Sequence, residues 1–202
     1  MGRPWGLVAS GFYVALPKSG CPFSGHFELA LFQGRFQEAL HHADTLVQSA
    51  QARGDSQAQA WGLCGVLLAQ LRLGCLPQAV EVLPLVAALP QQELQVLEQL
   101  WLAGVVAVVD LARGQGASAL AHARRVTRLA RQGGATSVGA LEGHAGAAQV
   151  YLTLWQRRPG NLALAAGAKQ ACQRLMDYAY RFPVAWPRAY ALVRSEIIAI
   201  VG

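Results

Sequence analysis

The sequence predicts an all-α fold, a solenoid of about four stacked helical hairpins. Three glycines recur at a constant interval: Gly34, Gly74 and Gly114. Each is followed five positions later by an alanine: Ala39, Ala79 and Ala119. Two tryptophans precede the second and third of these glycines by the same interval: Trp61 and Trp101. A glycine that ends one helix, and a small residue on the inner face of the next, are typical of a helical hairpin. Hairpins at a fixed stride stack into a solenoid.

The composition favours one domain with a real core. The chain has 202 residues, of which 53% are hydrophobic and 14% are charged, so we expect it to expose apolar surface when alone. The longest uninterrupted apolar run, Leu100 to Val109, is half the length of a membrane-spanning helix. Four cysteines without a CxxC pair favour reduced thiols, with Cys64 and Cys172 buried. The sequence therefore predicts a cytoplasmic protein without a membrane segment.

The start of the chain differs from the rest. Arg3 and the apolar stretch from Trp5 to Leu16 loosely resemble a signal peptide, but Gly6, Ser10 and Gly11 interrupt the stretch. We therefore expect an irregular leader over residues 1–24 and a helical-repeat domain over residues 25–202.

The helical period begins near His26. The first helix ends at the Gly34 turn, and the second carries an apolar stripe at spacings of three and four positions until Arg53 and Gly54. Asp55 or Ser56 caps the third helix, because a side-chain oxygen can accept from free backbone N–H groups. That helix contains Trp61 and continues to the Gly74 turn.

Prolines shape the middle of the chain. Pro77 suits the first turn of the fourth helix, whereas Pro84 removes a hydrogen bond, so this helix should be short or kinked. Pro90 should open the fifth helix, with Glu93 near the positive end of its dipole, and this helix should run to Gly114. The sixth helix is expected over residues 117–131.

The fourth hairpin departs from the constant stride. Its helices are expected over residues 137–155 and 162–180, and its turn at Arg158, Pro159 and Gly160 falls six positions late. A final helix should start at Pro187. A lapse of the period is typical of terminal repeats.

Several segments carry a resemblance to a known family. They are GDSQAQAWGLCG (54–65), LRLGCLPQAVEVL (71–83), GHAGAAQVYLTLW (143–155), ACQRLMDYAYRFP (171–183) and PRAY (187–190). Over about residues 26–192 the chain resembles the tetratricopeptide-like C-terminal region of multidomain adenylate cyclases, in which class III cyclase domains and an AAA-type ATPase module precede the helical tail. Related tails occur in MalT-like transcription regulators. The resemblance implies a tetratricopeptide-like solenoid, a signalling role, and a chain that is a fragment of a longer protein or a truncated product.

The sequence offers no catalytic or cofactor site. No GxxxxGK[ST] loop and no GxSxG elbow occur, and no strand pattern exists that would carry the metal-binding carboxylates of a cyclase domain. We expect no cofactor, no metal and no enzymatic activity from this chain. His144 is interpreted as a structural side chain in a packed helix. Six residues are assigned to packing between repeats: Trp61, Gly74, Ala79, Trp101, Gly114 and Ala119.

Arginines are the sharpest exposed feature of the sequence. Residues 113–202 hold twelve basic and three acidic side chains. Four arginines are close together: Arg124, Arg125, Arg128 and Arg131. Arg124, Arg128 and Arg131 share one helix face and form a ridge. Arg113, Arg157 and Arg158 are expected nearby. This ridge would grip an acidic partner or phosphates, although a solvated helix face is the simpler interpretation.

Two functional hypotheses remain. The first is a non-catalytic interaction or regulatory scaffold that binds a protein partner, including the upstream cyclase and ATPase domains that the resemblance implies. The alternative is an arginine-ridge module that associates with nucleic acid, as in the tail of an ATP-dependent transcription regulator. The second hypothesis is weakened because no aromatic residues alternate with the arginines to stack on bases.

Overall fold

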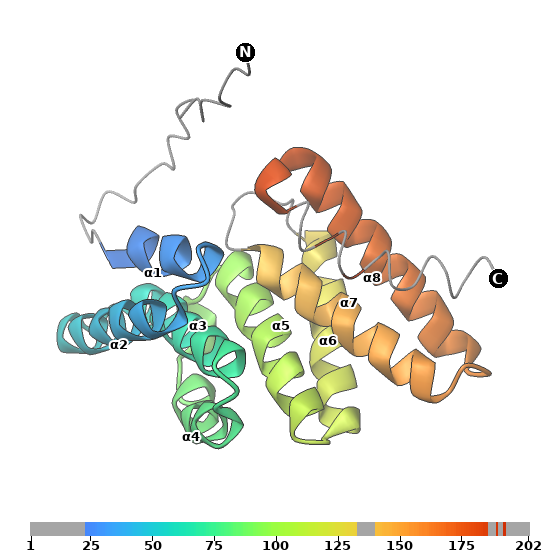
Figure 1. The fold of residues 1–202 in the computed structure, drawn as a ribbon, viewed down its shortest axis with the longest axis horizontal. Helices are drawn as coiled ribbons and strands as arrows, with labels where there is room; N and C mark the ends of the chain where they lie inside the picture. Colours follow the sequence, from blue (N-terminus) through green and yellow to red (C-terminus); the bar gives the residue numbers. More distant parts are fainter. Residues whose placement is uncertain (1–22, 133–139, 186–188, 190–191, 193–202) are drawn as a thin grey trace, which may run out of the picture.

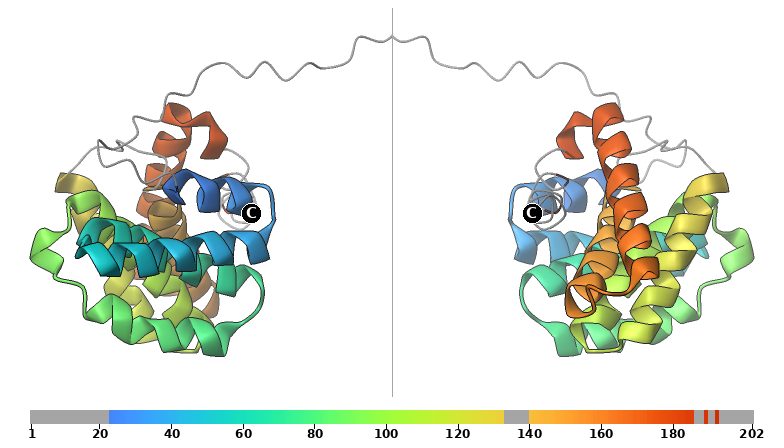
Figure 2. Two further views of the ribbon diagram at one scale, coloured as in Figure 1. Left: turned by 90° about the vertical axis from the view of Figure 1, so that its left-hand side faces the viewer. Right: turned by 90° about the vertical axis from the view of Figure 1, so that its right-hand side faces the viewer.

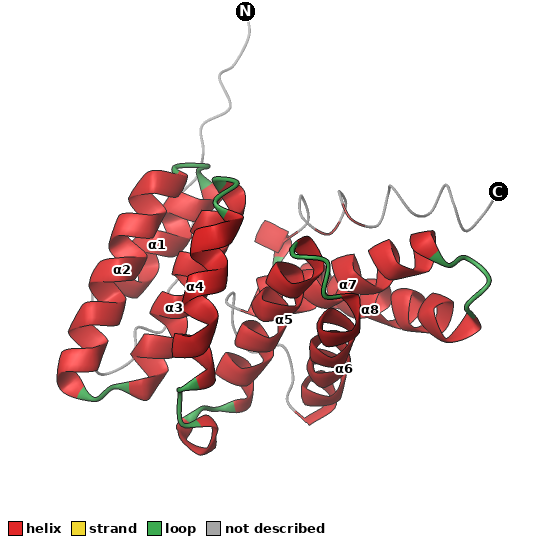
Figure 3. Ribbon diagram, turned by 90° about the horizontal axis from the view of Figure 1, so that it is seen from below, coloured by secondary structure: helices red, strands yellow, loops and turns green. Residues whose placement is uncertain are grey.

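The computed structural model describes residues 23–132 and 140–185, together with Ala189 and Leu192, and its secondary structure is helical throughout (Figures 1 and 3). This confirms the all-α prediction. In the described part of the chain there are eight α-helices and two short 3₁₀ turns. They are α1 (Phe23–Phe32), α2 (Phe36–Arg53), α3 (Ser56–Arg72), α4 (Leu76–Ala87), η1 (Gln91–Glu93), α5 (Val96–Ala112), α6 (Gly116–Gln132), α7 (Ala140–Arg157), α8 (Leu162–Arg181) and η2 (Pro183–Ala185).

The helices pack in sequential pairs: α1 with α2, α3 with α4, α5 with α6, and α7 with α8. The first helices of successive pairs also touch, since α3 contacts both α1 and α5, and α5 contacts α7. Each second helix contacts the first helix of the following pair. The α1–α2 pair therefore forms one end of the array and the α7–α8 pair the other (Figure 2).

Glycines with positive φ end four of these helices. The φ angles are 73° at Gly34, 65° at Gly54, 75° at Gly74 and 81° at Gly114. At Gly74 the N–H donates to the Leu71 carbonyl, and the next N–H, of Cys75, donates to the Gln70 carbonyl. The same two hydrogen bonds recur at the other three turns, so all four are Schellman caps. Three alanines that follow the turns at 34, 74 and 114 are fully buried: Ala39, Ala79 and Ala119.

The left-handed backbone conformation at Gly74 disfavours any residue other than glycine, and this can be tested. Gly74→Ala is expected to lower the free energy of unfolding by about 1 kcal/mol, because an L side chain is strained at this φ even though open space surrounds the position. Urea denaturation measures the effect. Gly160→Ala is the matched control, since Gly160 also faces open space but lacks a positive φ. Equal stability of the two variants would contradict the role assigned to the turn.

Helix α5 joins the two halves of the core. One cluster of buried residues extends from α1 to α5, and a second extends from α5 to α8. Twelve residues of α5 are buried, on all sides of the helix, which is typical of a helix surrounded by protein. Leu100 and Ala107 belong to the second cluster, whereas Trp101 and Val105 belong to the first.

Glycines let α5 and α7 cross in backbone contact. A Cβ added at Gly104 would lie 2.4 Å from the Gly143 Cα, and one added at Gly146 would lie 2.3 Å from the Gly104 carbonyl oxygen. A Cβ on Gly143 would likewise meet Leu100, with its Cδ2 at 2.4 Å and its carbonyl oxygen at 2.9 Å. Where Gly104 meets Gly143 and Gly146 the nearest neighbours are all backbone atoms, so the crossing has no room for a side chain at Gly104 or Gly146.

The structure confirms most of the predicted helix boundaries. As expected, α2 ends at Arg53, and the Asp55 carboxylate caps α3 by accepting from the Ala58 N–H at 3.0 Å. Helix α4 is short, with Pro84 inside it. The predicted leader lies outside the described residues except for Phe23 and Ser24, which open α1. The helix predicted from Pro187 also lies outside them, except for Ala189 and Leu192.

One predicted boundary is wrong. Pro90 does not open α5, which begins only at Val96, so Glu98 and not Glu93 occupies its first turn. The intervening segment forms the 3₁₀ turn η1 and then an extended residue, Leu94. The Gln99 amide donates to the Gln91 and Leu94 carbonyls at 3.2 and 3.0 Å. These bonds satisfy the carbonyl groups that a longer helix would have paired internally.

None of the helices in the described ranges is long and apolar enough to cross a membrane.

Candidate functional site

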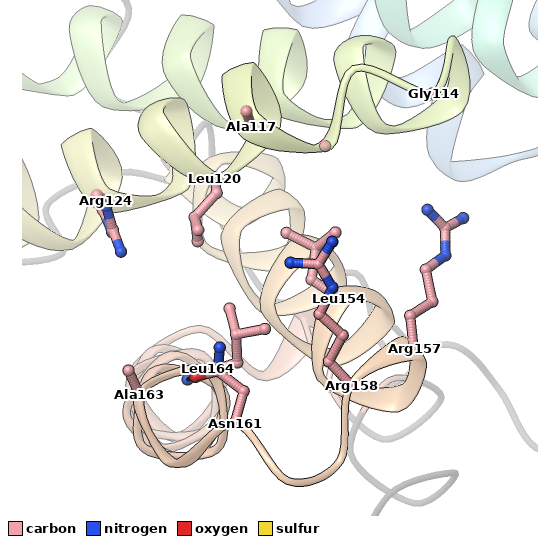
Figure 4. A pocket seen from close by; sticks show the side chains of 11 residues that line it. Gly114, Ala117, Leu120, Arg124, Leu154, Arg157, Arg158, Asn161, Ala163 and Leu164 are labelled. Atoms are coloured by element: carbon pink, nitrogen blue, oxygen red, sulfur yellow. Dashed lines mark hydrogen bonds between the residues drawn. The ribbon is translucent and has the colours of Figure 1, made fainter.

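A pocket of about 450 Å³ lies between helix α6 and the turn that joins α7 to α8 (Figure 4). One wall is the start of α6, from Gly116 to Arg124, together with the turn glycine Gly114. The opposite wall is the end of α7, the turn and the first residues of α8. The lining residues are Gly114, Gly116, Ala117, Leu120, Arg124, Leu154, Arg157, Arg158, Asn161, Ala163 and Leu164.

Local hydrogen bonds fix the α7–α8 wall. The Trp155 indole N–H donates to the Pro159 carbonyl at 3.2 Å, and the Asn161 N–H donates to the Arg158 carbonyl at 3.0 Å. The Asn161 side chain then caps α8 by accepting from the Leu164 N–H at 3.1 Å. Arg157 and Arg158 are therefore carried by a constrained turn.

A small residue keeps the other wall close. A Cβ on Gly116 would lie 3.3 Å from Leu154 Cδ2, which is tighter than ordinary van der Waals contact. Glycine at this position lets the start of α6 approach the end of α7. The pocket is therefore formed by the packing of α6 on α7, and it is absent from either helix pair alone.

Three guanidinium groups surround the pocket: those of Arg124, Arg157 and Arg158 (Figure 4). All three side chains are exposed, and none makes an ion pair with an acidic side chain among the described residues. The lining contains no carboxylate. Because the positive charge has no counter-charge within the pocket, the site attracts anions.

The floor of the pocket is aliphatic. Leu120 and Leu154 are half-buried and Leu164 is buried, and all three belong to or pack against the core that α5 to α8 share. Leu162, which opens α8 beside the pocket, is 83% exposed. The site thus combines unpaired cations with apolar surface, and it contains no hydroxyl, thiol, imidazole or carboxylate. That set of side chains suits binding and not acid–base or nucleophilic chemistry.

The predicted arginine ridge divides between two locations. Arg124, Arg128 and Arg131 are exposed along α6, and only Arg124 lines the pocket. Arg125 is half-buried on another side of the helix, where it donates to the Gln91 and Gln99 side-chain oxygens at 2.8 and 3.1 Å. Arg125 therefore positions α6 against η1 and α5.

Of the three arginines expected near the ridge, two reach the pocket and one does not. Arg157 and Arg158 line the pocket opposite Arg124. Arg113 instead pairs with buried Asp110, through Nε at 2.9 Å and through a second guanidinium nitrogen at 2.8 Å. The sequence signal missed Asn161 and the three leucines of the floor, because their pattern is that of an ordinary capped helix and core.

Four of the six residues assigned to repeat packing lie between helices, namely Trp61, Ala79, Trp101 and Ala119, whereas Gly74 and Gly114 are exposed turn residues with open space around them. Trp101 is 5% exposed and its ring stacks on Phe27 with centroids 6.1 Å apart. Trp61 is half-buried, and its indole N–H donates at 3.1 Å to Glu98, a carboxylate that is only 1% exposed. Gln57 donates to the same oxygen at 2.9 Å. The constant spacing thus places both tryptophans between α3 and its neighbours, with unequal burial.

Burial shifts the pKa values of two side chains outside the pocket, His144 and Cys64. Burial, with a smaller effect of Arg174, lowers the pKa of His144 to about 4, and its ring lies 5.4 Å from that of Tyr178. Burial also raises the pKa of the Cys64 thiol well above its ordinary value, whereas Cys172 is half-buried. Within the described ranges no group of three or more His, Cys, Asp or Glu residues is placed to hold a metal ion.

A half-buried carboxyl on α1 leads to a pH prediction. Burial raises the pKa of Glu28 from 4.5 to about 7, and the charge of Glu28 contributes to the raised pKa values of Cys64 and Tyr178. Because the folded state holds this proton more tightly than the unfolded state, the corresponding stability is present at acid pH and is lost as pH rises from about 4.5 to 7.

Glu28→Gln is therefore expected to stabilise the protein at pH 8 by about 2 kcal/mol and to change little at pH 4. Thermal unfolding of both proteins across this pH range measures the effect. Glu81→Gln, at an exposed position of α4, is the control. A stability difference that does not depend on pH would contradict the effect assigned to Glu28.

The chain matches no protein-family model and no curated protein.

Proposed function

We propose that this chain is a non-catalytic helical-repeat scaffold that binds another protein, and that its helix pairs form a tetratricopeptide-like solenoid. The order of helix contacts supports this architecture. First helices touch first helices along the array, and each second helix lies against the next pair. The evenly spaced Schellman turns at Gly34, Gly74 and Gly114 add to that support. Stacked hairpins of this kind present an extended surface for recognition.

The observation that carries the functional proposal is the lining of the pocket between α6 and the α7–α8 turn. Three arginines without an acidic counterpart and three leucines converge there, with no side chain that would transfer a proton or attack a bond. Such a site binds an anionic group attached to an apolar one. By the resemblance, the bound protein would include the cyclase and ATPase domains of a longer signalling product.

The competing proposal is association with nucleic acid through the arginines of α6. The exposed positions of Arg124, Arg128 and Arg131 favour it. The aliphatic floor of the pocket does not, because single-stranded nucleic acid is usually held on aromatic platforms. Duplex binding would instead rest on phosphate contacts alone and would weaken steeply with salt.

The test is capture followed by reconstitution. The intact chain is immobilised, a nuclease-treated extract of the source cells is passed over it at about 0.3 M salt, where charges beyond about 6 Å are screened, and the retained protein is identified and purified. The expected result is a saturable complex of fixed stoichiometry between the two purified proteins. Retention only from an extract without nuclease treatment, together with binding of the chain to random duplex DNA, would favour the nucleic-acid proposal and contradict the scaffold.

A further inference from the structure

We propose that the pocket between α6 and the α7–α8 turn is the binding site for an acidic peptide segment of the partner protein, in which a Glu or Asp side chain is flanked by aliphatic residues. This inference rests on the proposed scaffold function and adds to it the place and the chemistry of recognition.

Charge is the first reason. Arg124 approaches the pocket from α6, whereas Arg157 and Arg158 approach from the end of α7 (Figure 4). Elsewhere in the fold, three arginines have side-chain partners: Arg113 has Asp110, Arg72 has Glu142 at 3.5 Å, and Arg125 has two glutamine oxygens. The pocket arginines have no such partner in the described ranges. An incoming carboxylate would supply one, and guanidinium groups bind carboxylates with paired N–H donors.

Backbone donors are the second reason. The first turn of α6 and the first turn of α8 both line the pocket, at Ala117 and Ala163. At α8 the Asn161 cap accepts only from Leu164, so the N–H of Ala163 has no partner among the described residues. The N–H of Ala117 has none either in this part of the chain. Two helix N-termini thus add partial positive charge and free donors to the three arginines.

The apolar floor distinguishes a peptide from a free anion. A volume of about 450 Å³ exceeds what one carboxylate or phosphate occupies, and the remaining surface is formed by Leu120, Leu154 and Leu164. Inorganic phosphate would leave the leucines in water, whereas aliphatic side chains beside a carboxylate would cover them. The ligand class that uses both halves of the site is an acidic peptide with aliphatic neighbours.

The experiment uses the intact chain and a fluorescein-labelled, amidated synthetic peptide in which Glu and Leu alternate. Binding is followed by fluorescence anisotropy. Two companion peptides replace every Glu with Gln, or every Leu with Ser. We expect both to bind at least about tenfold more weakly, because a charge-assisted hydrogen bond and a buried aliphatic side chain each contribute about that factor.

The protein variants separate the pocket from general positive charge. Arg124→Gln and Arg158→Gln are each expected to weaken binding of the Glu-Leu peptide by about tenfold. Arg128→Gln is the matched control, since Arg128 is exposed on the same helix but lies outside the pocket. It should change the affinity by less than about twofold. Circular dichroism establishes that all three variants remain folded.

Several results would overturn the inference. Equal losses from Arg124→Gln and Arg128→Gln would mean that α6 attracts anions without a defined site. Equal affinity for the Glu-Leu and Glu-Ser peptides would reject aliphatic neighbours as part of the ligand. Arg124-dependent binding of duplex DNA or of anionic lipid vesicles in place of the peptide would reject an acidic segment altogether.

The failure of this inference can be told apart from failure of the scaffold. If the captured protein binds the Arg124→Gln/Arg158→Gln double variant as well as it binds the original chain, the pocket is not its binding site and the scaffold function stands. If no protein partner is captured and reconstituted, the scaffold function itself fails.

Discussion

Gly104→Ala is expected to lower the free energy of unfolding by about 3 kcal/mol, equivalent to a fall of roughly 10 °C in the unfolding temperature of a chain of this size. The added methyl group would lie 2.4 Å from the Gly143 Cα and 2.5 Å from the Gly143 carbonyl oxygen. Both obstacles are backbone atoms, so no side-chain rotation relieves the overlap. Helices α5 and α7 would have to separate along their contact, and the core that α5 shares with α6 to α8 would open.

Two effects of the substitution oppose each other. Alanine favours a helix over glycine by up to about 1 kcal/mol, whereas overpacking against a fixed backbone costs about 1–3 kcal/mol or more. Gly25→Ala is the control, because Gly25 lies within α1 with no heavy atom within 4 Å of an added Cβ, and it should be neutral or stabilising. Urea denaturation of both variants measures the balance. A Gly104→Ala protein as stable as the original would show that the two helices do not cross at this distance.

Local sequence signals predicted the turns more accurately than they predicted the contacts between helices. A glycine followed by a buried alanine is visible in the sequence, because the left-handed turn and the first buried residue after it are only five positions apart. The cap at Asp55 is local in the same sense. These features depend on residues close together in the chain, where backbone sterics decide the outcome.

The glycine crossing could not be predicted in this way. Gly104 and Gly143 lie on different helices with all of α6 between them in the sequence, and a glycine inside a helix shows only a loss of helix propensity until its neighbour is known. The error at Pro90 has a similar origin. Proline suits the first turn of a helix, but side-chain bonds from Gln99 back to the preceding carbonyls stabilise a 3₁₀ turn instead.

The pocket could be predicted from the sequence only in part. The clustering of arginines on α6 was visible in the sequence, and so was the proximity of Arg157 and Arg158 to a turn. That Arg124 faces this turn, while Arg125 points toward η1, follows from how α6 packs between α5 and α7. The sequence thus supplied the charges, and tertiary packing decided which of them meet.

The second large effect on stability is expected from the ion pair of Asp110 with Arg113. The Asp110 side chain is 2% exposed, whereas that of Arg113 is 37% exposed. Besides Arg113, the carboxylate accepts a hydrogen bond from the Ser118 hydroxyl and lies 3.7 Å from His122 Nε2. This network ties the end of α5 to the start of α6, directly beside the pocket. At the corresponding position before the Gly74 turn, Gln70 has a buried side-chain oxygen without a hydrogen-bond partner in the described part of the chain.

Because Asp110 is buried and Arg113 is exposed, removing one partner should cost more stability than removing the other. Arg113→Met is expected to cost about 3 kcal/mol, because it leaves a buried carboxylate without its cation. Asp110→Ala should cost less, about 2 kcal/mol, because Arg113 can then turn toward water and only the Ser118 and His122 contacts are lost. Arg35→Met is the control: it removes the exposed pair of Arg35 with Glu38 and should cost less than about 0.5 kcal/mol.

The double variant decides whether the cost belongs to the pair or to the carboxylate. If a buried, unpaired charge is the source, adding Asp110→Ala to Arg113→Met should recover about 1 kcal/mol, so that the double variant is more stable than Arg113→Met alone. Urea denaturation of the original chain, the two single variants and the double variant measures the four free energies of unfolding. Additive costs of the two substitutions would show that Asp110 is not held by Arg113, and that the α5–α6 connection depends on the glycine turn and the apolar core alone.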